Sequence, residues 1–262
     1  FQKYLNRGIL LAAFVLLWPM LRWLRQGGAV EWPVRPDIRR GRNLGVGIVL
    51  GAGAMLILAS SYLASGIYQW NKELPLGKIA AAAISAVVVS VLEETLFRGG
   101  MTGLFRRSMS EKGALWATTL IFAAVHFIRP DPSIQVESVS WSSGFLLLPH
   151  SFHQFANPAL LMGGLVTLVL FGWILGEAAR RTGALWMSIG IHAGLVFVKL
   201  GFERWTEKKQ ILLPWTGPEL QIGLIPVAVL SVMAVAMLWS TRDCSTWNLS
   251  LIHISEPTRP ER

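Results

Sequence analysis

The sequence contains little cysteine and few charged residues, and each shortage excludes some classes of protein and of functional site. A single cysteine, Cys244, occurs in 262 residues, which excludes an internal disulfide framework and a cysteine-based metal cluster. Charged residues make up only 15% of the chain and hydrophobic residues 53%, a balance that soluble globular domains rarely show. The chain also lacks a Gly-rich nucleotide loop and a Gly-x-Ser-x-Gly nucleophile elbow. The composition therefore predicts a membrane protein.

What the chain does have is a series of apolar runs near the roughly 20 residues that a helix needs to cross a bilayer. The candidate spans are residues 8–24, 44–70, 79 to about 106, 114–128, 158–178, 184–200 and 222–239. We therefore predict an all-α fold, a polytopic transmembrane helical bundle of about seven transmembrane helices, with an eighth left open for a complete chain. No linker or repeat separates the runs, so we expect one membrane-embedded domain over residues 1–248, with its core at 79–200.

Neither end of the sequence has the features expected of a native terminus. The stretch "LSLIHISEPTR", Leu249 to Arg259, reads as the translation of a sequencing adapter, and the chain opens at Phe1 without a methionine. We expect residues 249–262 not to be native and the true C-terminus to be missing, and leave the same open for the N-terminus. His253 is therefore set aside from functional reasoning.

The net charge of +9 resides mainly in the segments that connect the apolar runs. Such loop charges mark membrane topology, and we expect no nucleic-acid partner. If seven helices alternate, the basic segments 22–42, "FRRSMSEKG" and "ARRTG" share one side, which should be cytoplasmic. Residues 199–209 place further positive charges on the opposite side. We expect an integral membrane protein of a prokaryotic inner or plasma membrane, with the lipid bilayer as its first partner.

Ionisable residues directly follow an apolar run in the stretch "VLEETLFRGG", residues 91–100. Charge is costly inside a bilayer, so such residues usually face the protein interior and have a partner. Glu94 and Arg98 are four residues apart, on one helix face, and can pair. Glu93 is rotated by about 100° from Glu94 and can point into a different space. The stretch therefore predicts an ion pair beside a free carboxylate, although a purely structural ion pair is an alternative.

Two histidines lie in other apolar runs, His126 in "IFAAVHF" and His192 in "SIGIHAGLVF". If the third and fourth runs form a helical hairpin that turns near Ser110, Glu93 lies 17 residues before the turn and His126 lies 16 after it. With an equal rise per residue, the two side chains should then lie at nearly the same depth. Taken singly, each histidine fits a hydrogen-bonded core residue, but jointly these ionisable groups indicate a site. His150 and His153 lack partner carboxylates and fit a metal site less well.

These residues resemble the motifs of the CPBP family, named for CAAX proteases and bacteriocin processing and also called Abi. Its motifs are Glu-Glu-x-x-x-Arg, Phe-x-x-x-His and His-x-x-x-Asn or Asp, each on a separate transmembrane helix. The first is matched by Glu93, Glu94 and Arg98, the second by Phe122 and His126, and the third by His192 alone. Val196 stands where many members carry Asn or Asp, so a polar contact of the site must come from elsewhere, such as Ser188 or a loop residue. The resemblance covers about residues 79–197, without the long loop.

The resemblance implies an intramembrane endopeptidase acting on a membrane-associated protein or peptide. The family pattern makes Glu93 the general base that activates water, His126 a water-binding group, and His192 the stabiliser of the oxyanion. Glu94 and Arg98 would fix the geometry. Amide hydrolysis needs these tasks, because water must lose a proton and the carbonyl must be polarised.

Metal dependence and catalytic activity are left open by the sequence. Two histidines and a glutamate are a permissible zinc set, so Glu93, His126 and His192 would be the ligands of a divalent metal such as zinc. A metal-free glutamate-type protease is favoured slightly, because Arg98 would repel a cation. A non-catalytic membrane scaffold that binds a partner is the main alternative function, and a proton-coupled transporter is a third.

Overall fold

The computed structural model describes residues 39–71, 76–128, 149–156 and 158–242, together with Val15, Pro19 and Arg22. The first predicted span, residues 8–24, lies almost entirely outside the described residues. So do most of the long connection between residues 129 and 157 and the whole adapter-like tail. The single-domain prediction for residues 1–248 stays a prediction.

The described chain is mainly helical, with a helix at each of the other six predicted spans. These helices are α2 (Arg40–Ala64), α3 (Ile79–Glu94), α5 (Glu111–Val125), α7 (Pro158–Thr182), α8 (Trp186–Trp205) and α9 (Leu224–Ser240). The shorter elements are β1 (Tyr68–Trp70), η1 (Leu76–Lys78), η2 (Thr95–Met101), α4 (Thr102–Phe105), η3 (Pro149–Ala156) and β2 (Thr206–Lys208). The two strands form an antiparallel pair with Gln69 opposite Glu207.

Three helical stretches of the described chain are long and apolar enough to cross a membrane: residues 40–64, 79–105 and 161–182. Helix α9 is apolar but shorter. An all-α membrane protein therefore fits the structure, while the total of seven spans stays a prediction.

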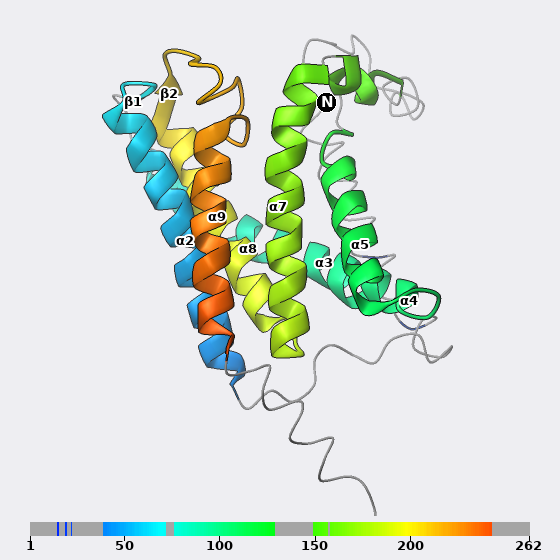
Figure 1. The fold of residues 1–262 in the computed structure, drawn as a ribbon. Helices are drawn as coiled ribbons and strands as arrows, with labels where there is room; N and C mark the ends of the chain where they lie inside the picture. Colours follow the sequence, from blue (N-terminus) through cyan, green and yellow to red (C-terminus); the bar gives the residue numbers. More distant parts are fainter. Residues whose placement is uncertain are drawn as a thin grey trace, which may run out of the picture.

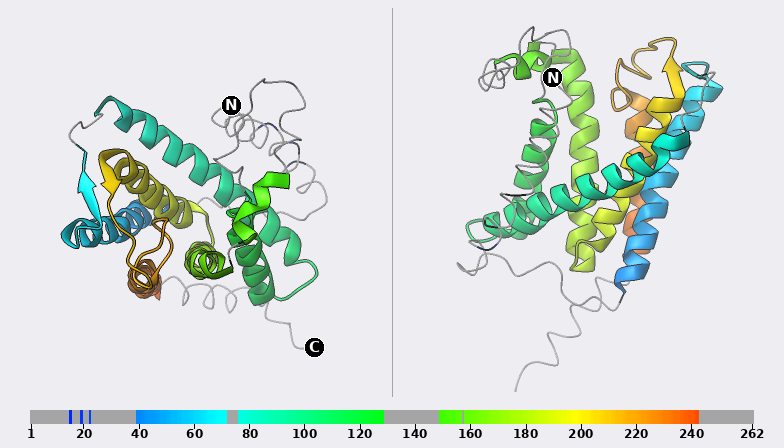
Figure 2. Two further views of the ribbon diagram at one scale, coloured as in Figure 1. Left: turned by 90° about the horizontal axis from the view of Figure 1, so that it is seen from above. Right: turned by 180° about the vertical axis from the view of Figure 1, so that it is seen from behind.

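The helices form a bundle that α3 crosses obliquely. Helices α2, α8, α9 and α7 run side by side. At the top of the molecule β1, which follows α2, pairs with β2, which follows α8 (Figure 1). Seen from behind, α3 slants from that end past α8 toward α4 at the other end of the bundle (Figure 2). The slant carries the last turn of α3 into the middle of the molecule.

The helix ends follow local sequence rules. Helix α5 begins after Ser110, whose backbone is extended and whose hydroxyl accepts a hydrogen bond from the Gly113 amide, as an N-cap residue does. Helices α2 and α7 are followed by Gly66 and Gly183, which adopt φ values of 68° and 66°. Glycine takes up this left-handed conformation without a Cβ penalty. The turn near Ser110 that the sequence predicts is therefore present.

Glycines allow α2 and α8 to pack backbone against backbone. A Cβ atom at Gly51 would overlap the Ile191 carbonyl group, and one at Gly190 would overlap the Leu44 carbonyl oxygen. Small residues permit such close helix approach in membranes. The glycines of α7 act likewise, since a Cβ at Gly172 would lie 2.9 Å from the Phe122 ring. This packing fixes α8, and with it His192, against its neighbours.

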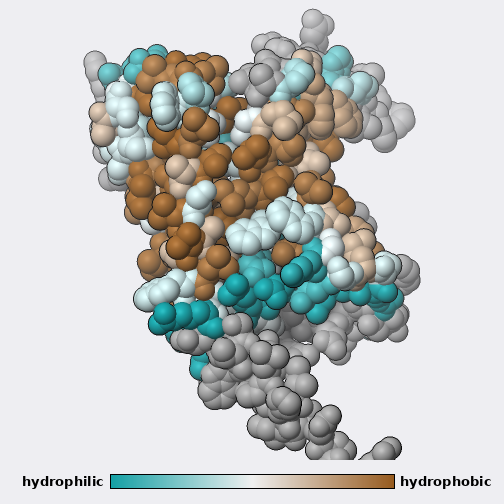
Figure 3. Space-filling model, viewed as in Figure 1, coloured by the Kyte–Doolittle hydropathy of each residue, from teal (hydrophilic) through white to brown (hydrophobic). Residues whose placement is uncertain are grey.

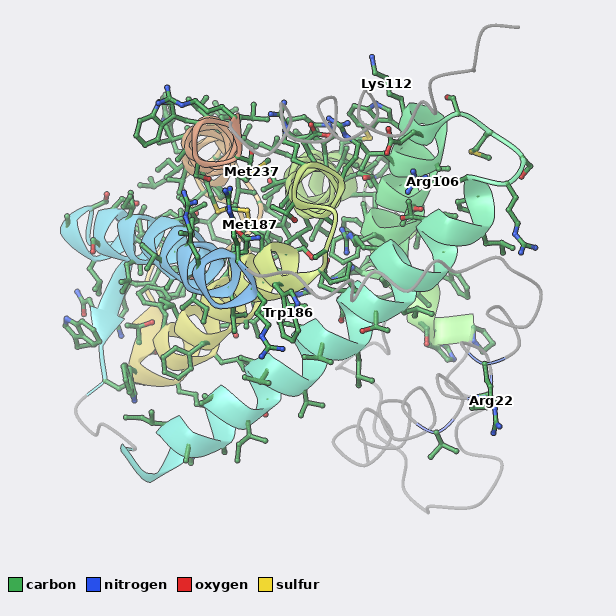
Figure 4. All side chains as sticks on the ribbon, turned by 90° about the horizontal axis from the view of Figure 1, so that it is seen from below. Arg22, Arg106, Lys112, Trp186, Met187 and Met237 are labelled. Atoms are coloured by element: carbon green, nitrogen blue, oxygen red, sulfur yellow. The ribbon has the colours of Figure 1, made fainter. Side chains whose placement is uncertain are left out.

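The surface has an apolar band and a charged end. The face made by α7 and α9 is hydrophobic over most of its height and hydrophilic at the lower end (Figure 3), where Glu177 pairs with Arg180 and Arg181. Seen from that end, Met187 and Met237 lie between α2, α8 and α9, whereas Lys112 points away (Figure 4). Exposed apolar side chains such as Val232 and Val235 of α9 suit contact with lipid.

Candidate active site

The two glutamates and the arginine lie where the regular helix α3 gives way to a wider turn. Glu93 and Glu94 are the last residues of α3, and Arg98 lies in η2, a π-helical segment within the continuous helix from residue 79 to 105. The Thr102 hydroxyl donates to the Phe97 carbonyl five residues earlier. Single π turns inside α-helices occur frequently at functional sites.

Glu94 is the buried centre of a hydrogen-bond network. Its side chain is 0% exposed, and its Oε1 atom accepts from Arg98 Nη1 and from His192 Nδ1, both at 2.9 Å. Arg98 Nη2 donates to the Gly172 carbonyl at 3.0 Å, and the guanidinium carbon lies 4.3 Å from the centre of the Phe122 ring. The predicted Glu94–Arg98 pair is therefore present and is extended to α8 and α7.

Both histidines turn the same nitrogen toward Glu93. His126 Nδ1 lies 2.7 Å from the Phe122 carbonyl oxygen, and a carbonyl only accepts, so Nδ1 carries the proton. By the same reasoning Nδ1 of His192 carries a proton, because its partner is the carboxylate of Glu94, which accepts. Each Nε2 then faces Glu93 Oε2, at 3.8 Å from His126 and 3.9 Å from His192. The depth match predicted for Glu93 and His126 is therefore found.

Glu93 Oε2, like Glu94 Oε2 and Ser90 Oγ, is buried and has no hydrogen-bond partner among the described residues. Buried polar atoms are rarely left unsatisfied in proteins. The gaps to the two Nε2 atoms are too long for direct hydrogen bonds. They suit a water molecule that would donate one proton to Glu93 and the other to a histidine.

A cavity of about 280 Å³ opens onto these groups. Glu93, His126 and His192 all line it, and most of the remaining wall is apolar, contributed by α2, α7, α8 and α9. The convergence of the three side chains on one cavity, which the sequence hypothesis requires, is present. Their catalytic roles stay predictions.

Val196 lines this cavity, so the position where the family pattern has Asn or Asp is apolar here. Ser188, the replacement considered from the sequence, donates its hydroxyl proton to the Leu185 carbonyl and does not line the cavity. Thr167 of α7 does line it and is 4% exposed. Sequence reasoning missed Thr167, because a single threonine in an apolar run carries no motif.

The side chains fit a metal site in type but not in spacing. Histidines that donate their other ring proton to a carboxylate or a carbonyl are typical of metal ligands, and Glu94 neutralises the Arg98 charge that argued against a cation. Two ligands of one tetrahedral zinc lie only about 3.3 Å apart, given zinc–ligand bonds of about 2.0–2.1 Å. The separations of 3.8 and 3.9 Å exceed this, and no three His, Cys, Asp or Glu side chains of the described chain form a metal-binding group. We therefore derive no chemical step through a metal.

The structure brings Glu93, Glu94, Arg98, His126 and His192 together and leaves the other histidine pair apart. His150 and His153 lie in η3, a short 3-10 helix, where His150 is exposed and its carbonyl oxygen lies 3.2 Å from the Nδ1 atom of His153. Among the described residues they have no carboxylate partner that could complete a metal site.

Comparison with known proteins bears on the same region of the chain. Residues 75–198 match the family of Rce1-like type II CAAX prenyl endopeptidases. No curated protein and no solved structure matches the chain. The matched stretch contains all five site residues and the departure at Val196, and the resemblance seen in the three motifs is confirmed. Residues 75–198 are therefore similar to the Rce1-like branch of the CAAX protease family, and this similarity supports a CAAX-type intramembrane protease.

Proposed function

We propose that this protein is an intramembrane endopeptidase that hydrolyses a peptide bond in a membrane-associated protein or peptide, with Glu93 as the general base. The observation that carries the proposal is the unpaired Oε2 atom of Glu93, which faces the Nε2 atoms of two histidines in one cavity. A base needs such an unengaged oxygen within reach of a water molecule.

In the proposed reaction, a water molecule gives one proton to Glu93 and is oriented by a hydrogen bond to His126 Nε2. The hydroxide attacks the carbonyl carbon, and the electron pair of the C=O bond moves to oxygen. His192, protonated on both nitrogens, donates from Nε2 to this oxyanion while Glu94 accepts from Nδ1. When the C–N bond breaks, Glu93 returns its proton to the leaving amine. The products are a carboxylic acid, which releases its proton to solvent on leaving the site, and an amine, and Glu93 is regenerated as a carboxylate.

Glu94 and Arg98 act through His192 in this scheme. A carboxylate bonded to a histidine Nδ1 fixes the ring orientation and stabilises the imidazolium, as in serine protease triads. Arg98 donates to the same oxygen of that carboxylate. These two residues are therefore positioning residues, while Glu93, His126 and His192 touch the reacting atoms.

The substrate is proposed from the apolar cavity wall and the family. Met55, Leu58 and Leu230 line the cavity near the site, and such a wall favours apolar groups over charged ones. A prenylated CAAX-type tail is therefore the first candidate, and an apolar leader peptide or a juxtamembrane segment of a membrane protein would fit the same wall.

The test compares membranes from cells that express the wild type or Glu93→Gln at matched levels, using mass spectrometry of protein termini. Glutamine keeps the shape of the side chain but cannot accept the proton from water. We expect new termini only with the wild type. Identical terminus profiles from two equally folded proteins would favour the non-catalytic scaffold, for which Val196 is the supporting observation.

Metal dependence is tested on the same cleavage. Purified protein is assayed against a substrate found in that comparison, with and without a zinc chelator, while bound metals are measured by elemental analysis. The metal-free scheme predicts unchanged activity and less than stoichiometric metal. Loss of activity with the chelator, restored by zinc, would instead assign Glu93, His126 and His192 as ligands.

A further inference from the structure

A second cavity lies on the other face of α8 from the candidate active site. It has a volume of about 540 Å³ and is formed by α2, α8, the start of α3 and β1. Helix α8 separates the two cavities, since His192 and Val196 line the first, whereas Phe197 and Gly201 line the second. We call this second cavity the α2–α8 groove.

The walls of the α2–α8 groove are apolar and open to the membrane. Leu56 is 54% exposed, Phe197 is 38% exposed and Ile79 is 36% exposed, and all three line the groove. In a bilayer these side chains meet hydrocarbon. An occupant of the groove must therefore carry an apolar chain.

Two cations, Lys78 and Arg204, are the charged residues that line the groove. The Nη1 atom of Arg204 is buried without a hydrogen-bond partner, and neither side chain pairs with another described residue. Arg204 is partly buried and Lys78 is exposed, and a charge without a counter-charge is costly where apolar groups or lipid remove its water. An occupant that brings an anion to this point would remove the cost.

Tryptophans mark the level of these cations in the membrane. Trp70 of β1 and Trp205 at the end of α8 both line the groove, and Trp70 is 59% exposed. Tryptophan is enriched at the level of lipid headgroups. The two positive charges therefore lie at headgroup depth, and the apolar part of the groove extends below them along α2 and α8.

We propose that the α2–α8 groove binds an anionic phospholipid, with its phosphate between Lys78 and Arg204 and an acyl chain along α2 and α8. The match lies in an apolar channel that ends, in a tryptophan belt, at two cations that pair with no other described residue. The bound lipid contacts α3 and α8, the two helices that carry Glu93 and His192.

The test is native mass spectrometry of delipidated protein in detergent, titrated with phosphatidylglycerol or phosphatidylcholine of identical acyl chains. We expect the wild type to retain one phosphatidylglycerol with at least tenfold preference. Lys78→Gln and the double variant Lys78→Gln/Arg204→Gln should lose most of that preference. The matched control is Lys209→Gln, which removes an exposed charge from the same end of the molecule but outside the groove.

A groove-filling variant, Gly201→Leu, tests the apolar part of the site. A Cβ atom at Gly201 would meet only the Trp205 ring, at 3.7 Å or more, so the backbone accommodates it. This variant should lose both lipids and keep its unfolding temperature in lipid-free detergent. The proposal is overturned if Gly201→Leu retains lipid, if the cation variants keep the preference, or if Lys209→Gln loses it equally. It is also overturned if Gly201→Leu loses only cleavage of prenylated peptides, because the groove would then hold the substrate.

Discussion

Glu93 and Glu94 are adjacent in sequence, yet their surroundings give them different tasks. The Oε1 atom of Glu94 is bonded to Arg98 and His192 and is shut off from solvent, whereas Glu93 faces the cavity. This difference follows from the rotation of about 100° between successive helix residues. One carboxylate organises the site and the other is free to react.

Replacing Glu94 with Gln should therefore damage stability as well as activity. The change removes one partner of a buried ion pair and leaves Arg98 with an uncompensated charge, which typically costs about 3–5 kcal/mol. Thermal unfolding in detergent should show a lower midpoint for Glu94→Gln than for Glu93→Gln. Equal midpoints for the two variants would contradict the assignment of Glu94 as the structural carboxylate.

Part of this residue-level arrangement was predictable and part was not. The Glu94–Arg98 pair and the depth match of Glu93 with His126 follow from spacing along one helix and one hairpin. The bond from His192 to Glu94 joins residues 98 positions apart, and no local spacing encodes such a contact. The orientation of each histidine ring could not be predicted either, because it depends on which group accepts the hydrogen bond from Nδ1 in the folded protein.

At the level of the elements, the contact between α2 and α8 depends on glycines that cannot be exchanged. We predict that Gly51→Ala lowers stability and cleavage, since its Cβ would overlap the Ile191 backbone one residue from His192. Gly53 lies on the same helix, and a Cβ atom added there would have nothing within 4 Å. Gly53→Ala should therefore be neutral or stabilising by about 0.5–1 kcal/mol. Similar unfolding midpoints for the two variants would refute the close contact.

The helix pattern also shows where sequence-based prediction of elements ends. The positions of α2, α3, α7, α8 and α9 in the chain follow from the apolar runs, although several of their ends differ from the predicted bounds by up to six residues for α2 and more for α3, whose run continues into η2 and α4. The π turn at residues 95–101 could not be predicted from those rules. Over two turns, the spacing of apolar residues in a π-helix differs little from the spacing in an α-helix. The oblique course of α3 is likewise set by packing against α8 and not by its own sequence.

On the scale of the whole molecule, charge distinguishes the two ends of the bundle. Arg40 begins α2, Arg106 follows α4 and Arg180 lies in the last turn of α7, and these three helix ends lie at one end of the bundle (Figure 1). Residues 39–42 of the first basic segment therefore share a side with the other two basic segments, as predicted. Lys208 and Lys209 lie at the opposite end with β2. The first end carries the larger set of cations and should face the cytoplasm.

The candidate active site reaches toward the other end, because Lys199 and Gln221 line its cavity. If the basic end is cytoplasmic, the substrate segment lies on the far side of the membrane. This can be measured with Lys112→Cys and Lys209→Cys, both at exposed positions, in a background that carries Cys244→Ser. A membrane-impermeant maleimide added to intact cells or spheroplasts should label Lys209→Cys and spare Lys112→Cys. The reverse labelling pattern would indicate the opposite orientation in the membrane. The mouth of the cavity and the peptide bond to be cleaved would then lie on the cytoplasmic side.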